Sequence, residues 1–244
     1  ANGDASPTVS VVVPALNEAV LLPGLLDALA AQTAPPHEVV VADAGSHDDT
    51  VGIARGRGVR VVAGGLPAAG RNAGAAASSG DLILFLDADV RPGVRFVERA
   101  VREFLARDLD AATAPLVPLE SGWDFRLVYA LVAHGLQAAA RVRPHAVGAC
   151  ILVRRGLHDR LGGFDETLAL AEDHDYAQRA AQAGRFGVLR TVRIPTSMRR
   201  VLHLGRLRYA RIITASELRL LRGRPVHRLP AGYDLGGDPP GDAP

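Results

Sequence analysis

The sequence predicts an α/β fold, a single domain with a mainly parallel central sheet flanked by helices. Two observations support this. Short apolar segments rich in β-branched residues recur along the first half of the chain, and segments with helical periodicity separate them. Such alternation is typical of a parallel sheet. The 244 residues are enough for one core. Neither an internal repeat nor a clear linker is visible, so we expect one domain at 8–225 and a disordered Pro/Gly-rich tail at 226–244.

Four apolar segments are the expected strands of the first half. They are Val9–Val13, Glu38–Val41, Val59–Ala63 and Leu82–Leu86. Helical spacing of apolar residues, or an acidic start that suits a helix N-terminus, predicts three helices between and after them. These are Leu21–Leu29, Asp48–Arg57 and Val94–Phe104.

The second half of the chain is less regular. Its expected helices are Trp123–Ala140, Glu172–Ala183 and Leu204–Leu221. Its expected strands are Ala146–Val153 and Val188–Ile194, the latter stopped by Pro195.

Polar side chains follow three of the predicted strands. Asn17 and Glu18 follow the first, Asp43 ends the second, and Asp87 and Asp89 follow the fourth. Parallel α/β sheets bind ligands beyond the carboxyl ends of their strands. In an extended segment Asp87 and Asp89 would point the same way. Carboxylate oxygens are the ligands that Mg²⁺ and Mn²⁺ prefer, so the sequence predicts a metal or diphosphate site at this edge.

Composition limits the function classes. All 28 cationic residues are arginine, but the net charge of +2 is too small to indicate nucleic-acid binding, and no basic patch with interleaved aromatic residues supports it. No stretch approaches the roughly 20 apolar residues that span a bilayer. The single cysteine, Cys150, excludes an internal disulfide and suits a reducing cytoplasm. We expect a cytoplasmic protein.

The C-terminal region is rich in arginine. Its leucines share one helical stripe, Leu204, Leu207, Leu218 and Leu221. Basic helices of this kind lie on anionic membranes, so contact with the inner face of the membrane, towards a lipid-linked acceptor, is one interpretation. A helix packed on the domain and a homodimer contact stay open as alternatives. The arginines are Arg199, Arg200, Arg206, Arg208, Arg211, Arg219, Arg222 and Arg224.

Five short motifs surround the Asp87-Ala88-Asp89 segment in a fixed order. Together they resemble the family 2 glycosyltransferases with the GT-A fold, over about Val9 to Tyr176. They are Val11–Glu18, Val39–Ser46, Gly70–Gly74, Leu161–Glu166 and Glu172–Tyr176.

The resemblance implies a donor site for a UDP- or GDP-linked sugar. The loop holding Pro14, Asn17 and Glu18 should lie against the nucleotide, with Glu18 near the ribose or base. Asp43 should bind the base. The family often shows two acids before Gly-Ser, whereas this chain has Ala42-Asp43-Ala44, which leaves the base open. Arg71 should approach the diphosphate or the base.

The resemblance also implies the remaining roles. Asp87 should face the ribose or sugar, and Asp89, with Asp87, should hold Mn²⁺ or Mg²⁺. His203 lies where some relatives place an extra metal ligand. Asp173 should be the catalytic base that takes the acceptor proton, with Glu172 and Asp175 as its rivals. Direct displacement would invert the anomeric centre, through an oxocarbenium-like transition state.

Each of these residues also has a structural interpretation. Asp43 could cap a turn with Ser46, and Arg71 could pair with a surface acid. Glu172 and Asp173 could be ordinary acids at a helix N-terminus. Cys150 fits a core position better than a nucleophile.

Three other functions stay open. The first is a retaining transferase of related fold that makes a small glycosyl glycerate, which the anomeric configuration of the product would reveal. The second is a sugar-1-phosphate nucleotidyltransferase, although Pro14–Glu18 lacks its glycine-rich phosphate loop. The third is a non-catalytic nucleotide-binding scaffold, against which Asp173 and the complete Asp-x-Asp segment argue. The acceptor is not encoded in any recognisable pattern.

Overall fold

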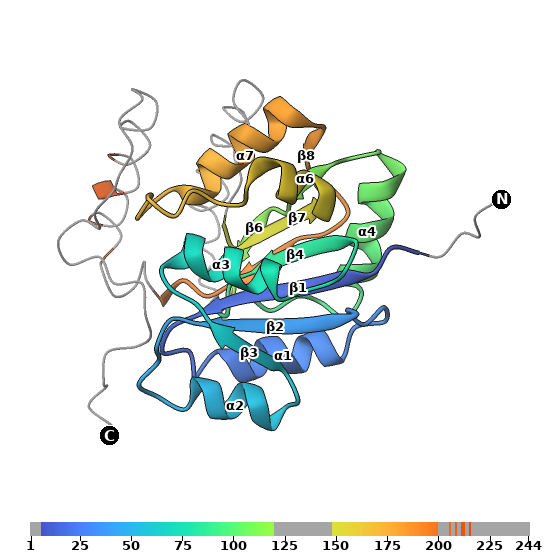
Figure 1. Cartoon of the computed structure of the whole chain (residues 1–244). Helices are drawn as coiled ribbons and strands as arrows, with labels where there is room; N and C mark the ends of the chain where they lie inside the picture. The colour runs from blue at the N-terminus through green and yellow to red at the C-terminus, as the bar shows by residue number, and fades with distance from the viewer. Residues whose placement is uncertain are drawn as a thin grey trace.

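The computed structural model describes residues 6–119 and 148–199, together with positions 205, 208, 211, 212 and 215. A seven-stranded sheet with the order β3-β2-β1-β4-β7-β5-β8 forms its centre (Figure 1). All neighbouring pairs are parallel except the two that β7 makes, with β4 and β5. The strands are β1 Val9–Ala15, β2 Glu38–Asp43, β3 Arg60–Ala63, β4 Leu82–Leu86, β5 Ala111–Thr113, β7 Cys150–Arg154 and β8 Phe186–Val188.

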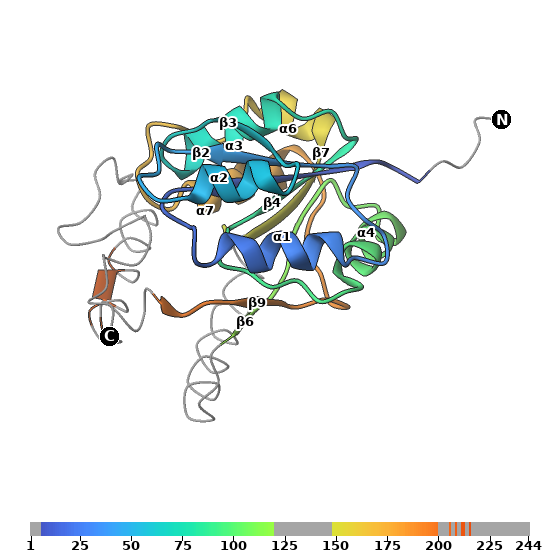
Figure 2. The ribbon, with the colours of Figure 1, turned by 90° about the horizontal axis from the view of Figure 1, so that it is seen from below.

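Helices cover both faces of this sheet. Buried side chains of α1, α2 and α4 pack on one face, and those of α3, α6 and α7 pack on the other. A two-stranded sheet of β6 and β9 lies on the side of α1 and α4 (Figure 2). The bounds are α1 Leu22–Ala30, α2 Thr50–Gly56, α3 Pro67–Ala76, α4 Phe96–Ala106, α6 Arg155–Leu161, α7 Glu172–Ala183, β6 Leu116–Pro118 and β9 Ile194–Thr196.

The central strands show why the sequence forms this layered structure. Every residue of β4 is buried, and side chains alternate between the two cores: Leu84 packs with α1 and α4, while Ile83 and Phe85 pack with α3 and α7. Strands covered on both faces read as continuous apolar runs, which is the pattern of β1 and β4.

Several predicted elements are confirmed. The strand at Leu82–Leu86 and the helix at Glu172–Ala183 have the predicted bounds. The strands and helices predicted in the first half are present within a few residues. The predictions for Trp123–Ala140, for most of Leu204–Leu221 and for the tail at 226–244 fall outside the described residues, as do the first two residues of Ala146–Val153.

The predicted strand Val188–Ile194 is wrong. β8 ends at Val188 and β9 begins at Ile194, and the two belong to different sheets. The backbone amides of Arg190 and Thr191 bind the Glu103 carboxylate of α4 at 2.8–2.9 Å instead of a neighbouring strand. The apolar residues of this segment therefore mark a crossover between sheets.

Helix α3 was not predicted. Its sequence holds alanine and glycine where an amphipathic helix would carry larger apolar side chains, so periodicity gave no signal. The small residues allow a close approach to the sheet. A Cβ on Gly74 would lie 2.3 Å from Cγ1 of Val12 on β1.

An aromatic cluster fixes α7 against the sheet. The ring of Tyr176 stacks on Phe164 with centroids 4.1 Å apart, and Phe85 meets Phe164 edge-on at 5.1 Å. Nδ1 of His158 on α6 is hydrogen-bonded to the Tyr176 hydroxyl at 2.9 Å. Burial lowers the pKa of His158 to about 4, so this histidine is neutral at pH 7.

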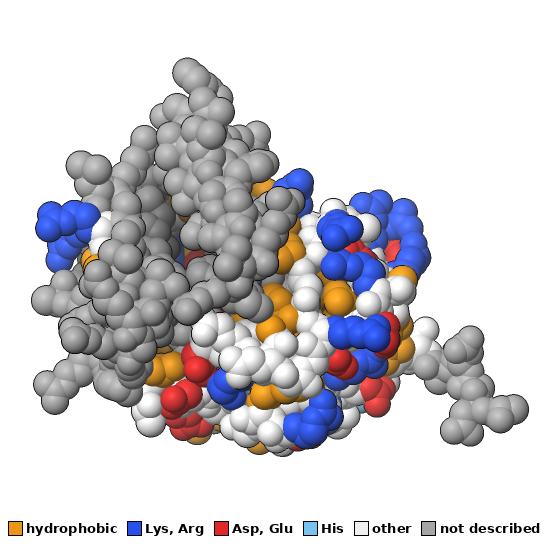
Figure 3. All heavy atoms as spheres, turned by 90° about the horizontal axis from the view of Figure 1, so that it is seen from above, with side chains coloured by type: hydrophobic (Ala, Val, Ile, Leu, Met, Phe, Trp, Pro, Cys, Tyr) orange, Lys and Arg blue, Asp and Glu red, His pale blue; other side chains and the backbone are white. Residues whose placement is uncertain are grey.

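No helix among the described residues is both long and apolar enough to cross a membrane. In a view from above, cationic side chains of the described surface lie next to anionic ones (Figure 3).

The low pKa of His158 predicts a pH-dependent stability. An unfolded histidine takes up a proton below about pH 6.5, whereas the folded one stays neutral down to about 4. The stabilisation is therefore complete above pH 6.5 and is lost as the pH falls towards 4, by up to about 3 kcal/mol. Urea unfolding of His158→Gln should show a weaker loss of stability over this range than the parent protein. The exposed His37→Gln should behave like the parent, and equal slopes for all three proteins would contradict the assignment.

Candidate active site

The loops that follow β1 and β2 are bound to one another at the carboxyl edge of the sheet. The amide of Ala44 donates to the Ala15 carbonyl at 2.8 Å. The Asn17 amide donates to Oγ of Ser46, and Oδ1 of Asn17 accepts from the His47 amide, both at 2.8 Å. Asn17 adopts a left-handed conformation, with φ of 53°, which few residues tolerate as well as asparagine. Pro14 lies at the same edge, near α3 at Gly70.

Glu18 is buried beyond the end of β1. Its amide donates to Oγ1 of Thr50 at 2.8 Å, and its carboxylate accepts from the guanidinium of Arg199. Arg199 is one of the arginines of the arginine-rich C-terminal region, and its side chain turns inward to Glu18. Arg199, beyond the end of β9, thus contacts the loop that follows β1.

Asp43 caps a tight turn. Its Oδ1 accepts from the Ser46 hydroxyl at 2.6 Å, and its Oδ2 accepts from the amides of Gly45 and Ser46 at 3.0 Å. These hydrogen bonds show that Asp43 caps a turn with Ser46, which was its structural interpretation. Contact of Asp43 with a nucleotide base stays a prediction.

The guanidinium of Arg71 on α3 is the centre of the site. It is fully buried and donates to Oε1 of Glu172 at 2.6 Å and to Oδ1 of Asp87 at 3.0 Å. Burial would lower the pKa of Arg71, but the charges of Asp87, Glu172 and Asp173 outweigh it and hold that pKa above its ordinary value. Arg71 therefore pairs with acids, as its structural interpretation allowed, but its guanidinium is buried. It joins the end of β4 to the start of α7.

The Asp87-Ala88-Asp89 segment does not continue β4. It forms a turn, in which the Val90 amide faces the Asp87 carbonyl, so the expected extended geometry is wrong. The Asp87 side chain is 24% exposed, and its Oδ2 makes no hydrogen bond to the described residues. Asp89 is buried, and its charge acts on Arg91.

This arrangement fits a cation that takes most of its ligands from a substrate. No group of three or more His, Cys, Asp or Glu side chains could hold a metal within the part of the chain that the structure describes. Mg²⁺ sites at substrate phosphates commonly use one or two carboxylates, with water and phosphate oxygens completing the shell. The open oxygen of Asp87 meets that requirement. His203 lies outside the described residues.

Three acids lie in the first turn of α7, and their carboxylates have different partners. Burial raises the pKa of Glu172, and its carboxylate is occupied by Arg71. Asp175 pairs with Arg179 at 2.7 Å. Asp173 forms no ion pair with the described residues; its Oδ2 accepts from the Gly148 amide and its Oδ1 from the His174 amide. The three carboxylates therefore differ in their partners: an arginine holds Glu172 and another holds Asp175, whereas backbone amides hold Asp173.

Two functional candidates were missed from the sequence. Asn72, beside Arg71 on α3, exchanges hydrogen bonds with the backbone of Phe164 at 2.8 and 2.9 Å and holds Glu166 at 2.8 Å. Gly148 contacts both Arg71 and Asp173. The motif around Arg71 contained Asn72, but neither residue type carries a charge that would single it out.

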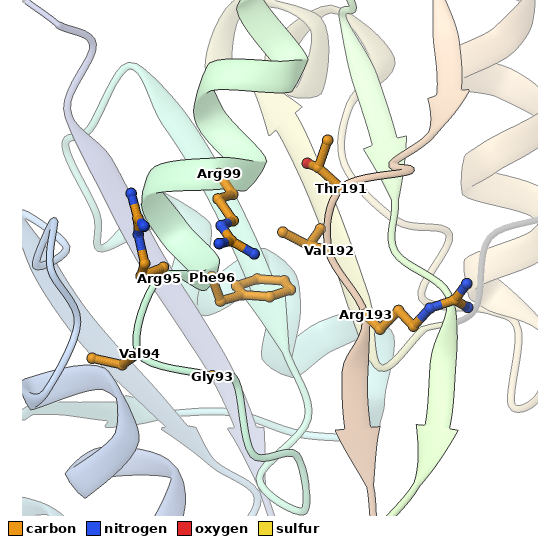
Figure 4. Close-up of a pocket in the computed structure, with 8 residues that line it drawn as sticks. All are labelled: Gly93, Val94, Arg95, Phe96, Arg99, Thr191, Val192 and Arg193. Atoms are coloured by element: carbon orange, nitrogen blue, oxygen red, sulfur yellow. The ribbon is translucent and has the colours of Figure 1, made fainter.

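A separate pocket of about 280 Å³ lies away from this edge (Figure 4). Residues 93–96 and 191–193, together with Arg99, line it. The pocket and the candidate site lie at opposite ends of α1. Beyond the C-terminal end, the Thr33 amide donates to the carbonyl of Val94, which lines the pocket; Glu18 of the candidate site precedes the N-terminal end. None of the residues predicted for the donor site lines this pocket.

A parallel sheet with polar groups gathered beyond its strand ends is the architecture of a ligand-binding α/β protein. The sequence matches the glycosyl transferase family 2 model over residues 10–162, which is more than half of the chain. The chain therefore belongs to glycosyltransferase family 2.

Two named relatives share parts of this sequence. The pre-mycofactocin glycosyltransferase of Mycobacterium tuberculosis is 33% identical over 126 residues, which cover 48% of this chain and 27% of the relative. Glycosyltransferase AglE of Haloferax volcanii is 29% identical over 191 residues, covering 73% of this chain and 62% of the relative. The chain thus spans about a quarter of the first relative's length and less than two thirds of the second's.

Solved structures share the fold. The mannosyltransferase PcManGT from Pyrobaculum calidifontis, in complex with GDP-Man and Mn²⁺, gives a TM-score of 0.69 at 24% identity, covering 89% of this chain and 65% of that one. Glucosyl-3-phosphoglycerate synthase from Mycobacterium tuberculosis, in complex with Mn²⁺ and UDP-glucose, gives 0.61 at 23% identity, covering 93% and 81%. The predicted GT-A fold is confirmed.

Removal of the Arg71 charge should destabilise the fold strongly. Arg71→Met leaves Glu172 buried without its cation, and breaking a buried ion pair in this way costs about 3–5 kcal/mol. Chemical denaturation measures the loss. The double variant Arg71→Met/Glu172→Leu should recover part of it, because the buried Glu172 carboxylate is then absent. Arg57→Met removes an exposed pair with Asp27 and should cost less than about 1 kcal/mol. A loss at Arg71 no larger than at Arg57 would contradict the buried-pair interpretation.

Proposed function

We propose that this chain transfers a sugar from a nucleoside-diphosphate sugar to a hydroxyl acceptor, with a divalent cation and with inversion at the anomeric carbon. The observation that carries the proposal is the contact of Arg71 with both Asp87 and Glu172. This contact joins the carboxyl edge of the sheet, where the donor would bind, to α7, which carries the proposed base. Membership of family 2 supports the reaction class.

The donor would lie across the carboxyl ends of β1, β2 and β4. The loops holding Asn17, Glu18 and Asp43 are already fixed by mutual hydrogen bonds, so they would present a rigid surface to the nucleoside. UDP- and GDP-sugars are both candidates, since the two structural neighbours above hold one of each.

A divalent cation at the diphosphate would stabilise, as a Lewis acid, the negative charge that develops on the leaving group. Asp87, through its open Oδ2, is the residue best placed to hold it, and Asp89 would add negative charge nearby. Asp87, Glu172 and Asp173 surround the single guanidinium of Arg71, so carboxylates outnumber the cations of the described site. Such an excess of negative charge favours the binding of a cation. Mn²⁺ and Mg²⁺ both suit these oxygen ligands.

Asp173 would accept the proton of the attacking acceptor hydroxyl. Glu172 is engaged by Arg71 and Asp175 by Arg179, so neither rival offers an unpaired carboxylate. Attack assisted by a base on the face opposite the leaving group inverts the configuration. The anomeric configuration of the product, measured by proton NMR, distinguishes this reaction from a retaining transfer to a glycerate.

Asp87→Asn should weaken metal-dependent binding of the nucleotide. The amide removes a negative charge and an anionic ligand, and changes near a bound metal commonly cost about 10–100-fold in affinity. Isothermal titration of UDP and GDP, each with and without Mn²⁺, measures the effect. Asp159→Asn, at an exposed position on α6, is the matched control. Unchanged affinity and unchanged metal dependence in Asp87→Asn would remove the cation from the proposal.

Asp173→Asn should lower transfer by about 10²–10⁴-fold, which is the usual contribution of general-base catalysis. Donor affinity should change little, because Asp173 contacts none of the loops after β1 or β2 in the hydrogen bonds described above. Asp175→Asn, two residues along the same helix, serves as the control and should keep most of the activity. Near-normal turnover of Asp173→Asn with both substrates saturating would show that the base lies elsewhere, and a loss of nucleotide binding would place Asp173 in the donor site.

A further inference from the structure

The backbone of Gly148 lies between the two ends of the proposed site. Its amide donates to Oδ2 of Asp173 at 2.5 Å, and its carbonyl accepts from Nη2 of Arg71 at 3.3 Å. The same Nη2 donates to Oδ1 of Asp87. One peptide residue therefore connects the Arg71 guanidinium, and through it Asp87, to the carboxylate of Asp173.

The next residues continue this connection into the sheet. The Asp87 amide faces the carbonyl of Ala149 at 3.4 Å, and Cys150 begins β7 opposite Leu86 of β4. The strand that follows Gly148 is paired with β4, which places Gly148 close to the end of the central sheet. A hydrogen bond from the backbone at this place restricts the rotamer of the side chain that accepts it.

A side chain at this position would crowd Asp173 and Arg71. A Cβ on Gly148 would lie 2.9 Å from Oδ2 and 3.2 Å from Cβ of Asp173, and 3.0 Å from Nη2 of Arg71. Two of these three contacts are with Asp173. A β-carbon at this position would therefore push against the Asp173 carboxylate and the Arg71 guanidinium where they approach the backbone.

We propose that Gly148 is a positioning residue for the proposed base: its amide holds Asp173 in place, and its lack of a side chain lets Arg71 and Asp173 approach it together. This inference rests on the proposed function of Asp173. Gly148 touches no reacting atom in this account; it acts through Asp173.

The expected effect follows from geometry. A carboxylate with free rotation about its side-chain bonds spends only part of its time facing the acceptor hydroxyl, whereas a bound oxygen fixes the rotamer. Displacement of a reacting group by about 1 Å can cost about 10²-fold in rate. Gly148→Ala should therefore lower kcat by about 10–100-fold, while the dissociation constant of the nucleotide stays within about 3-fold.

Gly93→Ala is the matched control. A Cβ at Gly93 meets no atom within 4 Å, and the residue lies at the pocket beyond the other end of α1. It should leave kcat and stability unchanged. Thermal unfolding of both variants tests whether Gly148→Ala retains the fold.

A double-mutant cycle separates positioning from a general structural effect. Gly148→Ala is measured in the parent protein and in Asp173→Asn. If Gly148 acts through Asp173, the substitution should lower transfer by about 10–100-fold in the first background and by less than about 3-fold in the second. An equal fold-change in both backgrounds would overturn the inference.

The remaining outcomes are also decisive. If Asp173→Asn lowers transfer but Gly148→Ala does not, the proposed function stands and this inference fails. If Asp173→Asn leaves transfer intact, the base assignment fails and the inference falls with it. If Gly148→Ala does not fold, glycolic acid at position 148, introduced by in-vitro translation, replaces the amide N–H with an ester oxygen and adds no volume. It should lower kcat without changing nucleotide affinity, and an unchanged kcat would overturn the inference.

Discussion

The buried guanidinium of Arg71 is the interaction on which the rest of the site depends. A charge in the interior is unfavourable unless it is paired and hydrogen-bonded. Arg71 meets this condition through Glu172 and Asp87, and its guanidinium also lies 5.4 Å from the centre of the Phe164 ring. Its partners come from the turn after β4 and from α7. Satisfying one buried charge therefore fixes the relative position of the elements that carry the proposed donor and base residues.

The small residues of α3 make this possible. Because Gly74 brings the helix against Val12, Arg71 and Asn72 start close to the sheet and reach across its edge. Arg71 binds the first residue of α7, and Asn72 binds the backbone at Phe164, which precedes α7 in the chain. Phe164 in turn stacks on Tyr176 of α7. Arg71 and Asn72, neighbours on α3, thus hold both the start of α7 and the segment at Phe164.

The sequence predicted the parts of the fold that have a clear apolar pattern. Continuous apolar runs identified β1, β2 and β4, and the acids after them lie at one sheet edge, as expected. Helix α3 and the β8–β9 crossover were not predicted, because alanine and glycine carry no amphipathic signal and because an apolar crossover resembles a strand. Close packing of Gly74 against Val12 holds α3 on the sheet. The Glu103 carboxylate binds the backbone of the crossover between β8 and β9.

The candidate site was predicted less completely. The sequence named Arg71, Asp87 and Asp173, yet spacing along the chain gave no reason to join Arg71 with Glu172, about a hundred residues away. The turn at Asp87–Asp89 replaced the expected extended geometry, and the Asp43 carboxylate was already used by its own turn. Gly148 was not recognised from the sequence, because it contacts Asp173 through its backbone amide and has no side chain that would indicate a role.

Hydrogen exchange tests the central claim most directly, because it locates the ligand on the whole protein without a substitution. The amides are compared with and without Mn²⁺ and whichever nucleoside diphosphate binds. We expect added protection after β1, β2 and β4, at residues 16–19, 44–47 and 87–90, and also at 172–175, because Arg71 joins α7 to that edge. Protection confined to another surface, such as the pocket at Gly93 and Val192, would contradict it.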